Sequence, residues 1–155
     1  MGGKLGKFDS VVEEIDYLLR HTSYIVRRRG RDILSDFDIT PPQFNALVTL
    51  IRHEDLTMGE LCQHLYLASS TVTDLVDRME RDNLVERVRD QKDRRVIRLR
   101  VRSEGHELLG KVMESRYRYL NEILDYLDDE EQESLRCSLH RLYDLMTERK
   151  TKKDS

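Results

Sequence analysis

The sequence lacks the motifs of the common enzyme classes and of disulfide-stabilised proteins. It contains no glycine-rich phosphate loop, no nucleophile elbow and no His-Glu-x-x-His motif, and its five histidines are scattered. Its two cysteines, Cys62 and Cys137, lie far apart, without a Cys-x-x-Cys motif or a histidine at metal-ligand spacing. We therefore expect no enzyme activity, no catalytic residue, no cofactor, no metal site and no disulfide framework. Both cysteines are interpreted as buried structural thiols.

Long hydrophobic runs are also missing. No segment approaches the roughly 20 consecutive apolar residues that cross a bilayer, and the polar first residues, Met1 to Lys7, contain no apolar signal-peptide segment. We therefore predict a cytoplasmic protein without a membrane partner. Apolar residues make up only 38% and charged residues 37%, a composition that favours long amphipathic helices buried partly against a partner. The length of 155 residues fits one composite unit.

Charge is distributed unevenly along the chain. The formal net charge is −3, yet residues 84–102 contain eight basic and three acidic residues. By contrast, residues 122–133 contain seven acidic residues and no basic residue. Such a protein would turn its basic segment toward a polyanion such as nucleic acid. A merely solvated, charged hairpin is the alternative interpretation of the same pattern.

Helical periodicity dominates both ends of the chain. Apolar residues recur every three or four positions from Phe8 to Phe37 and again from Leu108 to Leu127. After the first of these helices, Thr40-Pro41-Pro42 marks the start of a new helix. Asp128-x-x-Glu131 marks the start of the last helix. Helices this long project beyond one small globule and need a second surface to cover their apolar stripes. The stripes therefore predict a homodimer held by the terminal helices.

The middle of the chain combines short helices with a hairpin. A capping box, Thr57-x-x-Glu60, begins one short helix, and Ser69 or Ser70 can cap the next. Asn83 suits the left-handed position that ends this second helix. Two alternating segments rich in β-branched residues then flank a polar turn, which is the pattern of a two-stranded hairpin. The strands are expected at residues 84–89 and 96–101, and the turn at 90–95.

These patterns predict a mainly α-helical fold with a small β wing, in which a winged helix-turn-helix is joined to long terminal dimerisation helices. The expected parts are the N-terminal helix of the dimerisation region at 8–39, the winged helix-turn-helix DNA-binding domain at 40–102, the C-terminal dimerisation helices at 103–147 and a flexible tail at 148–155.

The short helices Thr57–His64 and Ser69–Arg81 have the size of a helix-turn-helix, whose second helix enters the major groove of DNA. That second helix presents small polar side chains outward, which allow close approach and can bond to phosphates or base edges. Simple helix caps would look the same, so this helix alone leaves the DNA-binding interpretation open. The outward residues are Ser69, Ser70, Thr71, Thr73, Asp74 and Asp77.

The hairpin turn favours DNA binding because it places arginines on a thin projecting element. An arginine at this turn can enter a minor groove, where narrow A·T segments deepen the negative potential. Asp93 would pair with an arginine and hold its guanidinium in one orientation. A surface salt bridge of little energetic value is the alternative interpretation of Asp93.

Three stretches together closely resemble the MarR family of transcription regulators. They are Gly59-Glu60-Leu61-Cys62 with Ser70-Thr71-Val72-Thr73-Asp74-Leu75-Val76-Asp77-Arg78-Met79-Glu80, Asn83-Leu84-Val85-Glu86-Arg87, and Asp93-Arg94-Arg95-Val96-Ile97-Arg98-Leu99. The Asp-x-Arg signature after a helix-turn-helix is specific to such a wing. The resemblance implies a homodimer on a pseudo-palindromic duplex, with the recognition helix in the major groove, Arg95 in the minor groove and Asp93 beside it.

The resemblance further implies a repressor that a small-molecule effector releases from DNA. Arg78 and Arg94 are expected to attract phosphates. The predicted DNA-binding residues are Ser69, Ser70, Thr71, Thr73, Asp74, Arg78, Asp93, Arg94 and Arg95. The candidate effector pocket comprises Tyr17, His21, Tyr24 and Arg28 with Phe44 opposite, although these residues would equally suit packing at the dimer junction.

Some positions depart from the family pattern. Cys62 replaces the usual alanine, which favours packing over sensing, and Asp74 stands where a basic residue is common, which should weaken phosphate contact there. The cysteine near the N-terminus of peroxide-sensing relatives is absent, so that chemistry is not predicted. A protein-interaction module that kept the scaffold but lost operator binding is the alternative function, and the intact Arg94-Arg95 turn argues against it.

Overall fold

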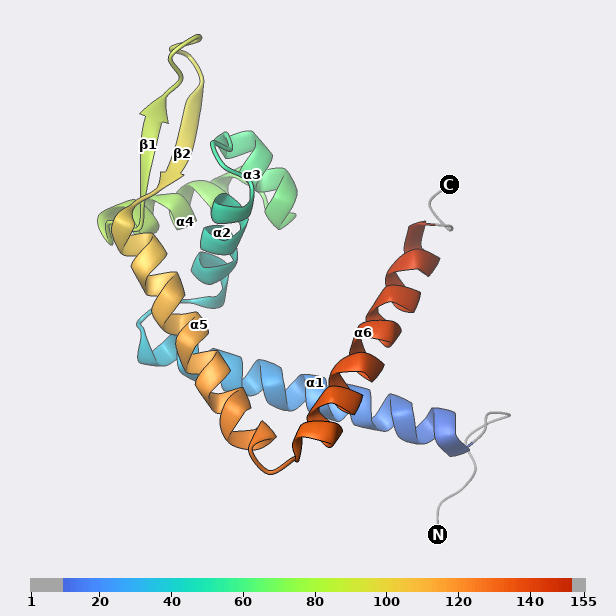
Figure 1. Cartoon of the computed structure of the whole chain (residues 1–155). Helices are drawn as coiled ribbons and strands as arrows, with labels where there is room; N and C mark the ends of the chain where they lie inside the picture. The colour runs from blue at the N-terminus through green and yellow to red at the C-terminus, as the bar shows by residue number, and fades with distance from the viewer. Residues whose placement is uncertain (1–9, 152–155) are drawn as a thin grey trace. The chain divides into compact units, whose positions relative to one another are not determined.

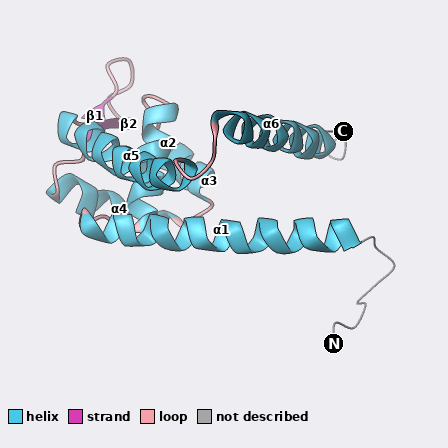
Figure 2. Ribbon diagram, turned by 60° about the horizontal axis from the view of Figure 1, so that its bottom comes forward, coloured by secondary structure: helices cyan, strands magenta, loops and turns pink. Residues whose placement is uncertain are grey.

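The computed structural model confirms a mainly helical fold with one two-stranded wing (Figure 1). It describes residues 10–151, and the chain divides into two compact units between Glu114 and Ser115. Figure 2 shows how little of the chain is strand. The elements are α1 (Ser10–Asp36), α2 (Pro41–Arg52), α3 (Met58–Leu65), α4 (Ser69–Arg81), β1 (Val85–Arg89), β2 (Ile97–Val101), α5 (Ser103–Leu124) and α6 (Asp129–Thr151).

Helix α1 buries only its C-terminal end in the first unit. Ile33 and Leu34 belong to the core, whereas the large apolar residues between Val11 and Val26 are exposed. The predicted apolar stripe is present, but most of it faces solvent in the single chain. Phe8, the expected first residue of this helix, lies outside the described residues.

Two capping boxes begin α2 and α3. At α3, the Thr57 hydroxyl accepts the Glu60 N–H at 3.2 Å and the Glu60 carboxylate accepts the Thr57 N–H at 2.7 Å, as the sequence predicts. At α2, Thr40 forms the same arrangement with Gln43, which our sequence analysis did not identify. Tyr66 ends α3 in the left-handed conformation, with φ 54°, and so makes the turn into α4 tight.

Helix α4 has the predicted bounds but not the predicted cap. Its N-cap residue is Ala68, and no side chain caps the helix. The expectation that Ser69 or Ser70 acts as the cap is therefore wrong, because the helix begins at Ser69 itself. Asn83, after the helix end, has φ 57° and takes the predicted left-handed conformation.

The hairpin pairs Val85 with Val101 at its base and Arg89 with Ile97 near its turn. One face of it closes the core of the first unit, where Leu99 is buried. The N–H of Leu99 also donates to the carbonyl of Leu56 at 2.8 Å, so β2 is tied to the segment before α3. The turn projects away from α2, α3 and α4 (Figure 1). The fully buried large side chains of this core include Leu47, Leu61, Met79, Leu99 and Val112.

Gly105 lies in the first turn of α5, and it is buried. A Cβ atom at this position would collide with the carbonyl oxygen of Leu84 and with the side chain of Val101. Glycine therefore allows the first turn of α5 to pack directly against the base of the hairpin.

The second unit consists of the C-terminal part of α5 and of α6. Asp128 and Glu131 form the predicted reciprocal cap, with N–H to carboxylate distances of 2.8 and 3.0 Å. The Gln132 amide donates to the carbonyls of Leu124 and Leu127 and so closes the corner between the helices. Helix α6 continues to Thr151, past residue 148, where the tail is expected to begin; residues 152–155 lie outside the described part.

The cysteines differ from their interpretation as buried thiols. Cys137 is exposed on α6, which corrects that interpretation, and Cys62 is only partly buried against the core. Between residues 10 and 151, no helix has the length and apolar character that a membrane span requires. Nor does this part of the chain gather three or more side chains that could hold a metal ion.

Candidate nucleic-acid interface

Helix α4 has one buried and one exposed face. Val72, Leu75, Val76 and Met79 pack into the core and hold the helix on the first unit. The opposite face carries all of the residues predicted for DNA contact on this helix, and each of them is exposed. They are Ser69, Ser70, Thr71, Thr73, Asp74 and Arg78, and the structure adds the exposed Arg81 at the end of the helix. The Thr73 hydroxyl donates to the Ser69 carbonyl at 2.9 Å.

Two acidic residues of α4 are bonded to an arginine of the wing. The guanidinium of Arg87 on β1 lies 2.6 Å from Asp77 and 2.5 Å from Glu80, and the backbone N–H of Arg87 also donates to Glu80. Asp77 faces outward as expected, with about half of its side chain exposed, and its carboxylate also pairs with Arg87. Burial disfavours the charge of Arg87, but the hydrogen bonds that it donates to both carboxylates outweigh this effect and raise the pKa of the guanidinium.

Strand β2 uses its arginines to anchor the wing. Arg98 donates to the carbonyl of Asp55 at 2.7 Å, and Arg100 donates to the Asp55 carboxylate at 3.0 Å. Arg102, after the strand, pairs with Glu86 at 3.3 Å. With Arg87, these account for half of the eight basic residues counted between residues 84 and 102. Half of those basic side chains therefore form bonds within the protein.

Asp90 organises the wing turn, a role that our sequence analysis did not assign. One carboxylate oxygen accepts the N–H groups of Lys92 and Asp93 at 2.7 and 3.0 Å, and the other accepts Arg98 Nε at 2.5 Å. The bond from Arg98, together with the two backbone N–H groups, lowers the pKa of Asp90 to about 2. An aspartate at the start of a polar turn commonly bonds to the backbone two residues on, which was the available signal.

The basic residues left for a partner gather around the turn. In the described part of the chain, Arg89, Lys92 and Arg94 are exposed and have no acidic side chain within salt-bridge distance. The Arg95 side chain is 95% exposed, and its Nε lies 3.9 Å from Asp93.

Asp93 acts mainly on the backbone of the turn. Its carboxylate accepts the backbone N–H of Arg95 at 3.0 Å, whereas the guanidinium of Arg95 approaches it only at the 3.9 Å limit of an ion pair. The two residues lie together as expected, but the planar, two-bond pairing of guanidinium and carboxylate is not formed here. Asp93 therefore holds the backbone of the turn at Arg95.

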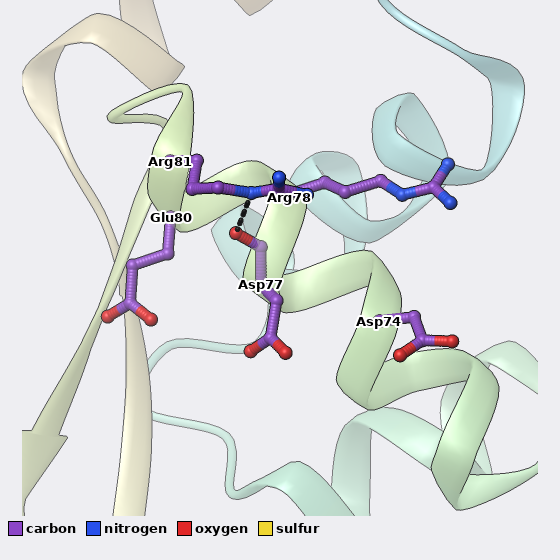
Figure 3. A pocket seen from close by; sticks show the side chains of 5 residues that line it. All are labelled: Asp74, Asp77, Arg78, Glu80 and Arg81. Atoms are coloured by element: carbon purple, nitrogen blue, oxygen red, sulfur yellow. Dashed lines mark hydrogen bonds between the residues drawn. The ribbon is translucent and has the colours of Figure 1, made fainter.

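A shallow hollow of about 700 Å³ runs along the exposed face of α4. Acidic and basic side chains line it together, and Figure 3 shows the Arg81 guanidinium bonded to the backbone carbonyl of Asp77. Its lining residues are Asp74, Asp77, Arg78, Glu80 and Arg81.

The residues of the candidate effector pocket lie in two environments. Tyr17, His21, Tyr24 and Arg28 share one exposed face of α1, where the rings of Tyr17 and His21 are 3.8 Å apart. Phe44 is buried in the core at the start of α2. The His21 Nδ1 atom lies 2.8 Å from the Tyr17 carbonyl, which holds the imidazole against the helix.

Comparisons with known proteins agree with this geometry. The MarR family model matches residues 37–96. An uncharacterized HTH-type transcriptional regulator of Bacillus subtilis, YsmB, is 44% identical over 84% of this chain and 90% of its own length. A MarR family protein structure from Bacillus stearothermophilus is also 44% identical, with a TM-score of 0.78 over 92% of this chain and 99% of that one. A mutant of S. aureus MepR bound to an oligodeoxyribonucleotide shares the fold, with 24% identity, a TM-score of 0.71 and coverage of 85% and 97%.

Proposed function

The chain belongs to the MarR family of winged helix-turn-helix transcription regulators, DNA-binding proteins rather than enzymes, and from this premise we propose that it binds a pseudo-palindromic duplex site as a homodimer. The observation that carries the proposal is the separation of charge within the wing. Arg87, Arg98, Arg100 and Arg102 are paired with acidic side chains. Among residues 10–151, the basic residues around the turn have no acidic partner apart from the 3.9 Å approach of Arg95 to Asp93. Free positive charge on a projecting element is what attraction to phosphates requires.

In the proposed complex, α4 lies in the major groove and the wing turn reaches the adjacent minor groove. The small side chains at the start of α4, such as Ser70 and Thr71, allow the helix backbone to approach the bases. Arg78 and Arg94 attract phosphates, and Arg95, directed by Asp93, enters the minor groove. The MepR complex, which shares the fold, is consistent with this use of the scaffold.

The dimer is supported by apolar surface that a single chain leaves exposed. On α1, Ile15 and Leu18 are about half exposed, and on α6 Leu139 is 52% exposed. Scattered exposed apolar residues are ordinary, but repeated rows of them along helices indicate a partner surface. The exposed rows are Val11, Val12, Ile15, Leu18, Ile25 and Val26 on α1, and Leu135, Leu139, Tyr143, Leu145 and Met146 on α6. A two-fold dimer would place its two copies of α4 about one helical turn of DNA apart.

The proposal includes repression that a small molecule relieves. The support is the row of polar-tipped side chains, Tyr17, His21, Tyr24 and Arg28, on the helix that leads directly into α2 and Phe44. A molecule bound to this row would act on the connection between α1 and the winged unit. A compound that raises the melting temperature and lowers the DNA affinity of the protein, but does neither in Tyr24→Ala, would support this part of the proposal.

DNA binding is tested with purified protein and duplexes enriched from a random pool, by fluorescence anisotropy at about 50 and about 200 mM salt. The affinity should fall steeply with salt. Arg94→Ala should weaken binding to all duplexes and reduce the slope of log K against log salt by about one or less. Arg141→Ala removes the same charge from α6 and is the matched control. Salt-independent or absent binding would instead favour the interaction-module alternative.

A further inference from the structure

The acidic side chains of α4 are not equivalent. Asp77 and Glu80 are bound by Arg87 of the wing, so the fold itself accounts for them. Asp74, one turn earlier, is exposed and has no hydrogen-bond or ion-pair partner among the described residues. Figure 3 shows its carboxylate at the surface of α4, apart from the other two acids. The stability of the fold therefore gives no reason for a negative charge at this position.

Asp74 occupies the centre of the exposed face. With 100° between successive residues, Ser70, Asp74 and Arg81 lie opposite the buried Val72 and Met79, whereas Arg78 lies to one side. In a groove-bound helix, the central row faces the base edges and the flanking residues approach the phosphates. The central position thus keeps the Asp74 carboxylate away from the phosphates, which would repel it.

The side chains around Asp74 permit a short residue to reach the bases. Ser70, Thr71 and Thr73 are small, and the first turn of α4 carries no bulky or basic residue outward. A carboxylate is an acceptor only, so in the major groove it can bond only to an exocyclic amino group. Cytosine presents its N4 amino group without an acceptor of its own beside it, whereas adenine places N7 beside N6, and guanine and thymine present no donor.

We propose that Asp74 is a specificity-determining residue that reads a cytosine through the N4 amino group in the major groove. The inference rests on the proposed DNA-binding function and assigns the recognition of one base in the DNA site to one residue of α4. Where the base pair offers no amino group in reach, the carboxylate is desolvated without a partner, so the wrong base is rejected and the right one is accepted. In a symmetric dimer, the cytosine would occur once in each half-site.

The test compares wild type, Asp74→Asn and Asp74→Ala in selections from random duplex DNA, with binding constants measured on the resulting duplexes. Wild type should enrich a cytosine at one position of each half-site and bind it about fivefold to tenfold more tightly than a duplex with that pair reversed. Asp74→Ala should lose preference at that position only, and it should bind unrelated duplex DNA more tightly because a negative charge is gone. Asp74→Asn should move the preference toward adenine, which an amide can bond through N6 and N7.

The outcomes separate the inference from the function on which it rests. If wild type enriches a site but both variants enrich the same site with the same preferences, the inference is overturned and DNA binding stands. If Asp74→Ala weakens binding to all duplexes equally, Asp74 supports the helix and does not read a base. If wild type enriches no sequence at all, the proposed function fails and the inference fails with it. Thermal melting by circular dichroism should show all three proteins equally folded, because the side chain is exposed.

Discussion

The sharpest prediction about the wing concerns Arg95→Ala. The side chain is 95% exposed, and its only ionic contact among residues 10–151 is the 3.9 Å approach to Asp93. Its removal should therefore change the free energy of unfolding by no more than about 0.5 kcal/mol. The backbone N–H that Asp93 holds is still present in alanine, so the turn should keep its shape. The variant should therefore remove the proposed DNA contact and leave the fold almost unchanged.

The loss of affinity should be on the order of 1–3 kcal/mol, which is about fivefold to 150-fold, for an enriched duplex with A·T-rich outer segments. On a duplex with G·C-rich outer segments the loss should be smaller, because the wider groove has a weaker negative potential. Arg95→Lys should recover only part of the affinity, since the compact ammonium is more strongly hydrated and has no planar fork. Fluorescence anisotropy on both duplexes measures these differences.

Asp93 provides the decisive comparison. Asp93→Ala removes the acceptor for the Arg95 N–H and should weaken binding, although it also removes a negative charge that repels DNA. Asp93→Asn keeps an acceptor at the same place and should retain most of the affinity. If Asp93→Ala bound the A·T-rich duplex more tightly than wild type, Asp93 would not direct Arg95 and the wing mechanism would be refuted.

Three further predictions address the fold and the dimer. Arg98 and two backbone N–H groups hold the pKa of Asp90 at about 2, against 3.8 normally, so the stability that the ionised carboxylate adds is present above about pH 4 and is lost as the pH falls toward 2. Asp90→Asn should thus melt at a lower temperature than wild type at pH 7. A difference in melting temperature that persists unchanged near pH 2 would contradict this. Changing Met79, which is fully buried on the core side of α4, to alanine should cost about 2–5 kcal/mol of unfolding free energy, as measured by urea denaturation; a loss under about 1 kcal/mol would mean that the core repacks. Leu139→Glu should shift sedimentation from dimer to folded monomer while Ser138→Glu does not, and an unchanged dimer would remove α6 from the interface.

Most of the secondary structure could be predicted because the signals that set it are local. The capping boxes act between residues three positions apart, so Thr57-x-x-Glu60 and Asp128-x-x-Glu131 mark their helices without tertiary information. The left-handed Asn83 and the alternation of β1 and β2 are equally local. The exposed face of α4 also followed from periodicity, because the same four apolar positions that define the stripe are the ones buried.

The predictions that failed, or were not made, concern groups that meet across the chain. Periodicity places Cys137 on a helix but does not say whether a neighbouring element covers it, and it is exposed. The need for glycine at position 105 becomes visible only when α5 is packed against the carbonyl of Leu84. The cap of α4 was expected at Ser69 or Ser70 but is Ala68, one or two residues earlier.

Counting charges along the sequence identified the basic segment but not which of its arginines can reach DNA. Arg98 and Arg100 donate hydrogen bonds to Asp55, which lies 43 and 45 residues earlier in the sequence. Arg87 donates to Asp77 and Glu80 across the junction of α4 with β1. Ion pairs of this kind require the hairpin to lie on the helices, and no local pattern encodes that contact. Tertiary packing therefore decided which charges are used within the fold and which remain free at the wing turn, because a guanidinium already bonded to a carboxylate gains little from a phosphate.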